Sequence, residues 1–301
     1  GLKFVQIDEF YPLNPNQHNS FYNYVCKYYI KGFELDPKNA LLINSDKISL
    51  VDGKNRKLIF PDNQIDLTLR FRDAINKIEE EQQESILLID QWCSEYENKI
   101  RAMGGIGFFL GGIGPDGHIA FNVRGSDHNS TTRLTGTNFE TQAAAATDLG
   151  GIEISRNRLV ITIGLGTITY NPDATGIIIA AGEAKSNIIK NSLENAPDVK
   201  YPATALAKLK KSCFYITKGA GKLLTDSQKD YWENSEWNDQ KLQRSILELS
   251  KNINVFGKKL TLENLRNDDH CKDIPSLNAD TVSDIIKKVE RKVEKGSKLE
   301  T

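Results

Sequence analysis

Residues 111–122 read GGIGPDGHIAFN and join a glycine-rich turn to an acid and a histidine. Glycines after a strand let the backbone approach a ligand closely, and successive amides can bind oxyanions or hydroxyls. Asp116 lies two residues from His118, one of only 4 histidines in the chain. A carboxylate near an imidazole fixes its tautomer and raises its basicity, as acid–base catalysis requires. The run therefore predicts a catalytic Asp116–His118 pair beside a ligand-binding backbone.

A second polar segment, residues 182–185 (GEAK), lies where an apolar run ends and a helical pattern begins. Free amides, the positive end of a helix dipole and the Lys185 ammonium together suit a phosphate group. An ordinary turn with an exposed lysine would contain the same residues, so both interpretations stay open.

A third polar segment, Asp8 and Glu9, directly follows the apolar residues 2–7. Ligands of open α/β sheets bind at the carboxyl ends of the strands, where these two acids are expected to lie. The alternative is a pair of acids that cap a turn.

The elements that must position these residues alternate between strands and helices. Apolar runs predict strands at residues 2–7, 40–43, 106–110, 158–163, 176–181 and 213–217. Helical periodicity predicts helices at residues 21–30, 67–103 and 185–193, and residues 44–66 are expected to be irregular and partly hairpin-like. Near-continuous apolar strands separated by helices indicate an α/β fold whose parallel sheet has helices on both faces.

The character of the chain changes after about residue 224. One helical stripe runs through Leu242, Ile246, Leu249 and Ile253, and a second through Val282, Ile285, Ile286, Val289 and Val293, with Gly296 as its stop. We therefore expect an α/β domain at residues 1–224 and a helical extension or linker at residues 225–301. A strand as the first element, with nothing before it to cover its faces, also suggests that the chain lacks its true beginning.

Composition excludes several classes of function. The formal net charge of -1 gives no global electrostatic case for nucleic acid or membrane binding. No apolar run reaches the roughly 18 residues that a membrane helix needs, and no signal peptide is recognisable, so a cytoplasmic location is expected. The 4 cysteines are far apart, which indicates neither a zinc cluster nor a disulfide framework.

The polar segments described above also resemble a known protein family. The run GIGPDGHIAFN (residues 112–122) closely resembles the signature of glucosamine-6-phosphate deaminases. The related 6-phosphogluconolactonases share the Asp-Gly-His core but usually diverge after it, so residues 119–122 favour the deaminases. The resemblance covers most of residues 2–220 and extends to residues 7–10, 18–21, 96–100, 132–135, 163–167 and 182–185.

This resemblance implies a Rossmann-like α/β domain that acts on an amino-sugar 6-phosphate. Asp8 would be the base that moves a proton between C2 and C1 of the open-chain sugar, after which ammonia leaves and fructose 6-phosphate remains. His118 would transfer the proton that opens the pyranose ring, with Asp116 orienting it. The implied substrate-binding residues are Glu9, Gly111, Gly112, Gly114, Arg133 and Lys185, of which Lys185 would hold the phosphate. No metal or organic cofactor is implied, and a homo-oligomer is one option.

The sequence departs from the family pattern at several places. Val123 stands where a Glu usually completes the dyad of Asp116 and His118, and Asp127 is the nearest acid that could substitute. Thr147 stands where an Arg usually assists the phosphate, residues 44–88 are longer than usual, and the first βαβ unit of the family is absent before residue 1. The tail resembles the linker of longer deaminase-like proteins.

These departures leave two alternatives to a deaminase. One is a lactonase-type hydrolase of a sugar phosphate, in which His118 activates water and Asp8 is dispensable. The other is a sugar-phosphate-binding module without catalysis, which Val123 and Thr147 favour.

Overall fold

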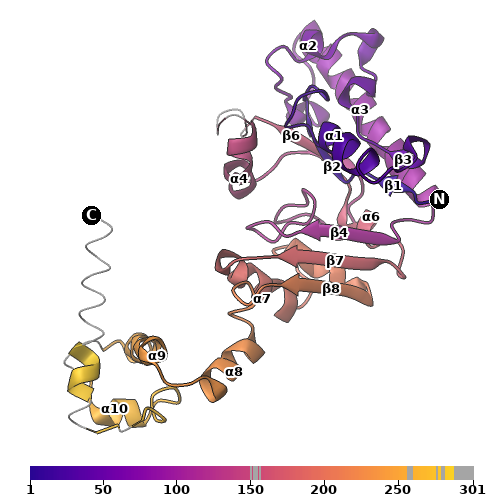
Figure 1. Ribbon diagram of the computed structural model, residues 1–301. Coiled ribbons are helices and arrows are strands. Elements are labelled where there is room, and N and C mark those ends of the chain that lie inside the picture. The colour runs from indigo at the N-terminus through magenta and orange to yellow at the C-terminus, as the bar shows by residue number, and fades with distance from the viewer. Residues whose placement is uncertain are drawn as a thin grey trace. The chain divides into compact units, whose positions relative to one another are not determined.

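Figure 1 shows the computed structural model of the chain, which describes residues 1–149, 151, 155, 157–255, 260–275, 277–278 and 282–287. The chain divides into two compact units, residues 1–224 and residues 225–301. The polar segments that predict chemistry all lie in the first unit, which is built around three small sheets.

A parallel sheet carries the glycine-rich run. Its strands, in the order β4-β7-β8, are β4 (Phe108–Gly112), β7 (Thr175–Ala180) and β8 (Lys211–Ile216). They lie side by side in Figure 1. Their runs of Phe, Leu and Ile suit strands, because branched and aromatic side chains pack well on a pleated surface.

A second sheet, of order β2-β6-β5, is antiparallel. Its strands are β2 (Asp8–Tyr11), β6 (Leu159–Thr162) and β5 (Arg133–Thr135). A third, two-stranded sheet pairs β1 (Phe4–Val5) in parallel with β3 (Ala40–Leu41).

Helices and helical turns connect the strands of the first unit. The α-helices are α1 (Phe21–Tyr24), α2 (Arg56–Ile59), α3 (Lys77–Ala102), α4 (Phe139–Leu149), α6 (Leu165–Ile168) and α7 (Ser186–Glu194). A π-helical segment, η1 (Val25–Ile30), continues α1. The 3-10 turns are η2 (Pro37–Asn39), η3 (Ser45–Lys47), η4 (Val51–Gly53), η5 (Leu67–Arg70), η6 (Glu183–Lys185) and η7 (Pro202–Lys208).

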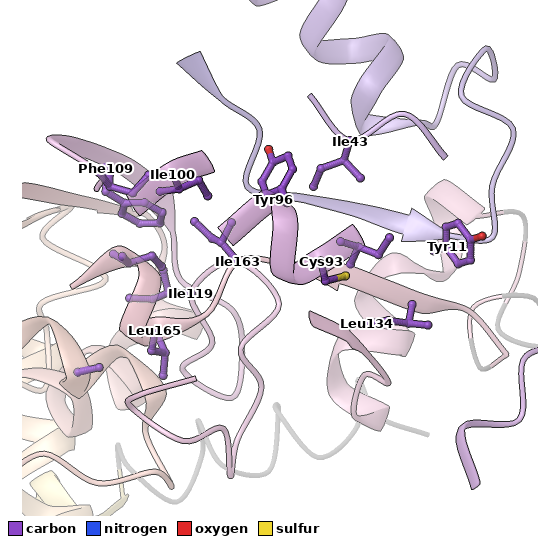
Figure 2. Close-up of a cluster of buried hydrophobic side chains, with 14 of the residues drawn as sticks. Tyr11, Ile43, Cys93, Tyr96, Ile100, Phe109, Ile119, Leu134, Ile163 and Leu165 are labelled. Carbon is purple, nitrogen blue, oxygen red and sulfur yellow. The ribbon is translucent and has the colours of Figure 1, made fainter. Parts of the chain in front are cut away.

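Helix α3 supplies the central packing surface of the first unit. Asn76 caps its beginning by accepting a hydrogen bond from the amide of Glu79 at 3.0 Å. Its buried stripe includes Ile89, Cys93, Tyr96 and Ile100, and Figure 2 draws the last three with other members of the same buried cluster, among them Phe109 of β4 near Ile100. This stripe has helical spacing, so one face of α3 is buried in the core.

The sequence predicted the α/β fold class, which is confirmed, but it missed details of the sheets. The run at residues 158–163 forms β6, and it pairs antiparallel with β2 and β5, so the expectation of a parallel strand here was wrong. The strand expected at residues 2–7 is divided, with β1 ending at Val5 and Asp8 already inside β2. The irregular stretch 44–66 contains two 3-10 turns and α2 instead of a hairpin.

One face of the parallel sheet is apolar and exposed. Phe108, Leu110, Ile179 and Tyr215 are 60%, 50%, 54% and 63% exposed. They alternate along their strands with buried neighbours such as Phe109 and Ile178, which face the core. Within the described residues, therefore, only one face of this sheet packs closely.

The second unit has its own small core. Its helices are α8 (Thr225–Asn234), α9 (Asp239–Asn252) and α10 (Leu262–Arg266). Its buried side chains are Ile246, Leu249, Leu260, Leu265, Cys271, Ile274, Val282, Ile285 and Ile286. Of the second predicted stripe, Val289 and Val293 lie outside the described residues, as does Gly296. No described helix has the length and apolar character that would let it cross a membrane.

Candidate functional site

The turn that follows β4 brings an imidazole onto the backbone of a glycine. The amide of Gly114 donates to the carbonyl of His118 at 3.0 Å, and the amide of Gly117 donates to the carbonyl of Gly114 at 3.1 Å. Gly117 has a φ of 87°, which a side chain would strain. A Cβ on Gly114 would lie 2.0–2.4 Å from three atoms of the His118 ring. Only glycine therefore lets the ring occupy this position.

Asp116 is a buried carboxylate with hydrogen bonds on both oxygens. Its Oδ1 lies 2.6 Å from Nδ1 of His118, and its Oδ2 accepts from the amide of Arg124 at 2.9 Å and from Nδ2 of Asn138 at 2.5 Å. Its side chain is 0% exposed. Burial alone would raise the pKa of Asp116, but these bonds and the charge of His118 outweigh it, so the pKa lies below its usual range. Asp116 is thus ionised at neutral pH.

The ionised Asp116 determines which nitrogen of His118 can react. A carboxylate can only accept hydrogen bonds, so Nδ1 must carry the proton at their 2.6 Å contact. Thr141 Oγ1 lies 3.3 Å from the same nitrogen, and the ring stacks on Phe121 at a centroid distance of 5.9 Å. In the neutral ring Nε2 therefore holds a free lone pair, as a general base requires.

Asn138 and Thr141 are the site residues that sequence reasoning missed. They lie at the start of α4, where Thr141 is 3% exposed. The alanine-rich residues 143–146 and an Asn ahead of them are signals for a helix and its N-cap, and could have located α4. No sequence signal indicates that this helix would start beside Asp116.

Lys185 reaches the glycine-rich turn from η6, the 3-10 turn that follows the neighbouring strand β7. Because β4 and β7 are parallel neighbours, the segments after Gly112 and Ala180 emerge at the same edge. The Nζ of Lys185 donates to the carbonyl of Ile113 at 2.8 Å. Burial lowers the pKa of Lys185 and the charge of Asp116 opposes this shift. The ammonium therefore lies close to the turn that holds the Asp116–His118 pair.

The antiparallel sheet places Asp8 and Arg133 on one face. In its register Asp8 lies opposite Thr162, and Thr162 lies opposite Arg133, so the three side chains share a face. Thr162 Oγ1 accepts from the amide of Phe121 at 3.1 Å, and Arg133 donates to Oδ1 of Asn122 at 2.9 Å. This face therefore meets the segment that directly follows His118.

Asp8 is a perturbed acid. Burial and, secondarily, the charge of Glu9 raise the pKa of Asp8 to about 8. Strongly shifted carboxyl groups are typical of functional sites, because a base must be matched to the working pH. The position and the pKa of Asp8 both suit proton transfer.

Glu9 points away from this face and binds helix α1. It is 1% exposed, and its oxygens accept hydrogen bonds from Ser20 Oγ and from the amides of Phe10, Phe21 and Tyr22 at 2.7–3.1 Å. Burial raises the pKa of Glu9 although these hydrogen bonds oppose it. The structure thus gives Glu9 four partners within the protein, and substrate contact by Glu9 stays a prediction.

The positions that depart from the family pattern can be located too. Val123 is half-buried and directly precedes Arg124, whose amide binds Asp116. Asp127 is exposed, accepts from the amide of Asn129 at 2.7 Å, and acts electrostatically on Arg133. The contacts that complete the Asp116–His118 pair come from Asn138 and Thr141 instead. The side chain of Thr147 lies outside the described residues. No described group of three or more His, Cys, Asp or Glu residues could hold a metal ion.

Comparisons with known proteins find similarity to glucosamine-6-phosphate deaminases and isomerases. No protein-family model matches the chain. A glucosamine-6-phosphate deaminase of Borreliella afzelii is 33% identical over 150 residues, which is 50% of this chain and 55% of the relative. A glucosamine-6-phosphate isomerase of Candida albicans is 38% identical over 119 residues, 39% of this chain and 48% of the relative. Human glucosamine-6-phosphate deaminase 2 is 29% identical over 220 residues, 73% of this chain and 64% of the relative.

The chain thus spans about half the length of the first two of these relatives. Among solved structures, a monomeric glucosamine-6-phosphate deaminase superposes with a TM-score of 0.53 at 22% identity, over 73% of this chain and 74% of that one. This likeness bears on the fold alone.

Proposed function

Since the chain belongs to the glucosamine-6-phosphate deaminase/isomerase family, we propose that it converts glucosamine 6-phosphate, or a close amino-sugar phosphate, to fructose 6-phosphate and ammonia. The observation that carries the proposal is the buried, ionised Asp116, which fixes His118 with Nε2 free. Lys185 beside it and Asp8 across the segment after His118 supply the remaining groups that the reaction needs.

The first step is ring opening. His118 Nε2 takes the proton of the C1 hydroxyl and delivers it to the ring oxygen, which yields the open-chain amino aldehyde. Asp116 stabilises the imidazolium that forms in between, because its carboxylate already holds Nδ1. The Lys185 ammonium pairs with the phosphate, which is the substrate group farthest from C1 and C2.

The second step is proton transfer from C2 to C1. Ionised Asp8 removes the C2 proton, which the neighbouring aldehyde and ammonium acidify. The nitrogen loses a proton and the aldehyde oxygen gains one, so that an enediol-type intermediate with an amine at C2 forms. Return of the proton to C1 leaves an imine at C2. Water then adds to the imine carbon and ammonia leaves, which gives the ketone of fructose 6-phosphate. Water is consumed, so the overall reaction is a hydrolysis joined to an isomerisation.

A coupled assay for fructose 6-phosphate and ammonia tests this proposal. We expect turnover by the wild-type chain, and a loss of about 100- to 10,000-fold in kcat for Asp8→Asn, because a positioned base contributes about that factor. Lys185→Met should raise KM more than it lowers kcat. The Glu95→Gln variant, on an exposed position of α3, serves as the control.

Two results would contradict the proposal. If the chain hydrolyses a sugar-phosphate lactone, and if Asp8→Asn retains this hydrolysis rate, the lactonase alternative is favoured, in which His118 Nε2 activates water. Calorimetric binding of glucosamine 6-phosphate without turnover would favour the non-catalytic binding module.

A further inference from the structure

We propose that Asn138 is a positioning residue that holds the Asp116 carboxylate, and through it the His118 imidazole. It would do so in place of the glutamate that related deaminases usually have where this chain has Val123. The inference deepens the proposed function and rests on it for its catalytic consequence. Asn138 itself contacts neither of the reacting groups assigned above, His118 Nε2 and Asp8. Its hydrogen bonds instead join the start of α4 to the buried acid behind the imidazole.

The orientation of the Asn138 amide follows from its partners. The backbone amide of Thr141 can only donate, and it lies 3.0 Å from Oδ1 of Asn138, which must therefore be the oxygen. The other atom of the side-chain amide, Nδ2, then faces Oδ2 of Asp116 at 2.5 Å. The side-chain oxygen of Asn138 thus caps α4, and its side-chain nitrogen donates to Asp116.

Asn138 makes one of two hydrogen bonds that hold Oδ2 of Asp116. The second comes from the amide of Arg124, in the loop that follows the turn. Because Asp116 is fully buried, an oxygen that loses a donor finds no water to replace it. Thr141, three residues further along α4, adds a contact to Nδ1 of His118. The first turn of α4 thereby contacts both members of the pair.

The amide and a carboxylate would affect the pair differently. A carboxylate at this place would face Asp116 with like charge, and one of the two acids would have to retain a proton. The neutral amide donates instead, and its hydrogen bond helps to lower the pKa of Asp116. The other charged groups that face Asp116 are His118 and Lys185. The pair therefore keeps one fixed negative charge.

Asn138→Asp separates the two tasks of the residue. Aspartate is as good an N-cap as asparagine, so the cap of α4 survives, while the donor to Asp116 becomes a carboxylate. The matched control is Asn76→Asp. Asn76 caps α3 through the same kind of bond, 3.0 Å from the amide of Glu79, and its side chain bonds no buried acid among the residues that the structure describes.

Two measurements follow, of which the first needs no activity. The urea midpoint of Asn138→Asp should fall below that of the wild type as pH rises from about 5 to about 8, because the two carboxylates repel when both are ionised. Asn76→Asp should show no such pH-dependent loss. In the coupled assay, kcat of Asn138→Asp should fall about 10- to 100-fold, the range expected for a bond to a charged group, with KM within about 3-fold.

Asn138→Ser provides a second variant in case the aspartate prevents folding. Serine can still cap α4 but is too short to reach Asp116, so kcat should fall, and the urea midpoint should fall at every pH because the buried Oδ2 of Asp116 loses a donor. If Asn138→Asp matches Asn76→Asp in its pH dependence, and Asn138→Ser keeps its kcat, Asn138 is only a helix cap. If the wild type shows no turnover, the proposed function fails, and the urea experiment still decides whether Asn138 holds Asp116.

Discussion

At the scale of the single residue, the absence of a side chain at Gly114 is as important as the presence of His118. The imidazole lies over the Gly114 backbone, where a methyl group would lie 2.0–2.4 Å from it. The ring in Gly114→Ala must therefore move, and a displacement of about 1 Å can cost about 100-fold in rate. Steady-state kinetics should show this loss in kcat.

The control for this substitution is Gly107→Ala, because nothing lies within 4 Å of a Cβ at that glycine. It should retain its activity, and urea unfolding should show that both variants are folded. Full activity of Gly114→Ala would contradict the position of His118 described above.

The raised pKa of Asp8 predicts how activity depends on pH. The base must be ionised, so kcat/KM should rise with pH and reach half of its plateau where the pKa lies, at about 8. A profile that stays flat from about pH 6 to about pH 9 would exclude Asp8 as the base in the free enzyme.

The same shift predicts a change in stability. Between the usual pKa of an aspartate and the raised pKa of Asp8, the folded chain holds a proton that the unfolded chain releases. The free energy of unfolding should therefore fall as pH rises through this interval, and fall less in Asp8→Asn. Urea unfolding at a series of pH values measures both slopes.

The site residues could be predicted from sequence only where they are neighbours in sequence or belong to a known pattern. Asp116 and His118 are two residues apart, so any compact turn brings them together, and they do pair. Asn138 lies 22 residues from Asp116, and their contact depends on where α4 packs. Local pattern carries no information about that packing, so the residue could not be found in advance.

At the scale of the element, Glu97 joins three segments near the site. Its Oε2 accepts from the amide and the hydroxyl of Thr132 and from the hydroxyl of Thr167, at 2.7–3.1 Å, and its Oε1 accepts from Arg101 at 2.8 Å. Helix α3, the beginning of β5 and helix α6 thus share one buried carboxylate. Arg133, the first residue of β5, directly follows Thr132.

Glu97→Gln should lower the free energy of unfolding by about 1–3 kcal/mol, because an amide group faces donors with its own NH2. Although burial raises the pKa of Glu97, the hydrogen bonds from Thr167, Arg101 and Thr132 lower it overall. The stabilisation is therefore present above the usual pKa of a glutamate and is lost as pH falls through the lowered one. Urea unfolding against pH, with exposed Glu95→Gln as control, should show a smaller acid loss in Glu97→Gln.

The sequence predicted where most strands lie, but it predicted less well which strands pair and in which direction. The runs at residues 106–110, 176–181 and 213–217 became β4, β7 and β8 with shifts of one or two residues at their ends. The strand β5, Arg133–Thr135, has no apolar run and exists because it pairs with β6. Composition likewise says nothing about strand direction, which explains the wrong expectation for β6.

At the scale of the whole molecule, each of the two units has a core of its own. Ile89 is 0% exposed in the first, and Leu265 is 0% exposed in the second. We expect two unfolding transitions in calorimetry. Ile89→Ala should lower one midpoint and Leu265→Ala the other, since each such truncation costs about 2–5 kcal/mol in its own core.

Leu87→Ala, at a position that is 60% exposed on α3, is the control and should move neither transition much. A single transition that both core variants shift equally would show that the chain unfolds as one cooperative body. The division of the chain into compact units falls at Leu224, and the interpretation of residues 225–301 as a helical extension or linker stays a prediction.

The neighbouring acids Asp8 and Glu9 also help to determine the pairing register of β2 against β6. They point to opposite faces of the strand, so a slip of one residue against β6 would exchange them. In the slipped pairing, the longer acid would face the segment after His118, and Ser20 with the amides of Phe21 and Tyr22 would lose their buried acceptor. The hydrogen bonds from Ser20 and the start of α1 to Glu9 therefore stabilise only the strand register in which the shorter acid, Asp8, faces the site.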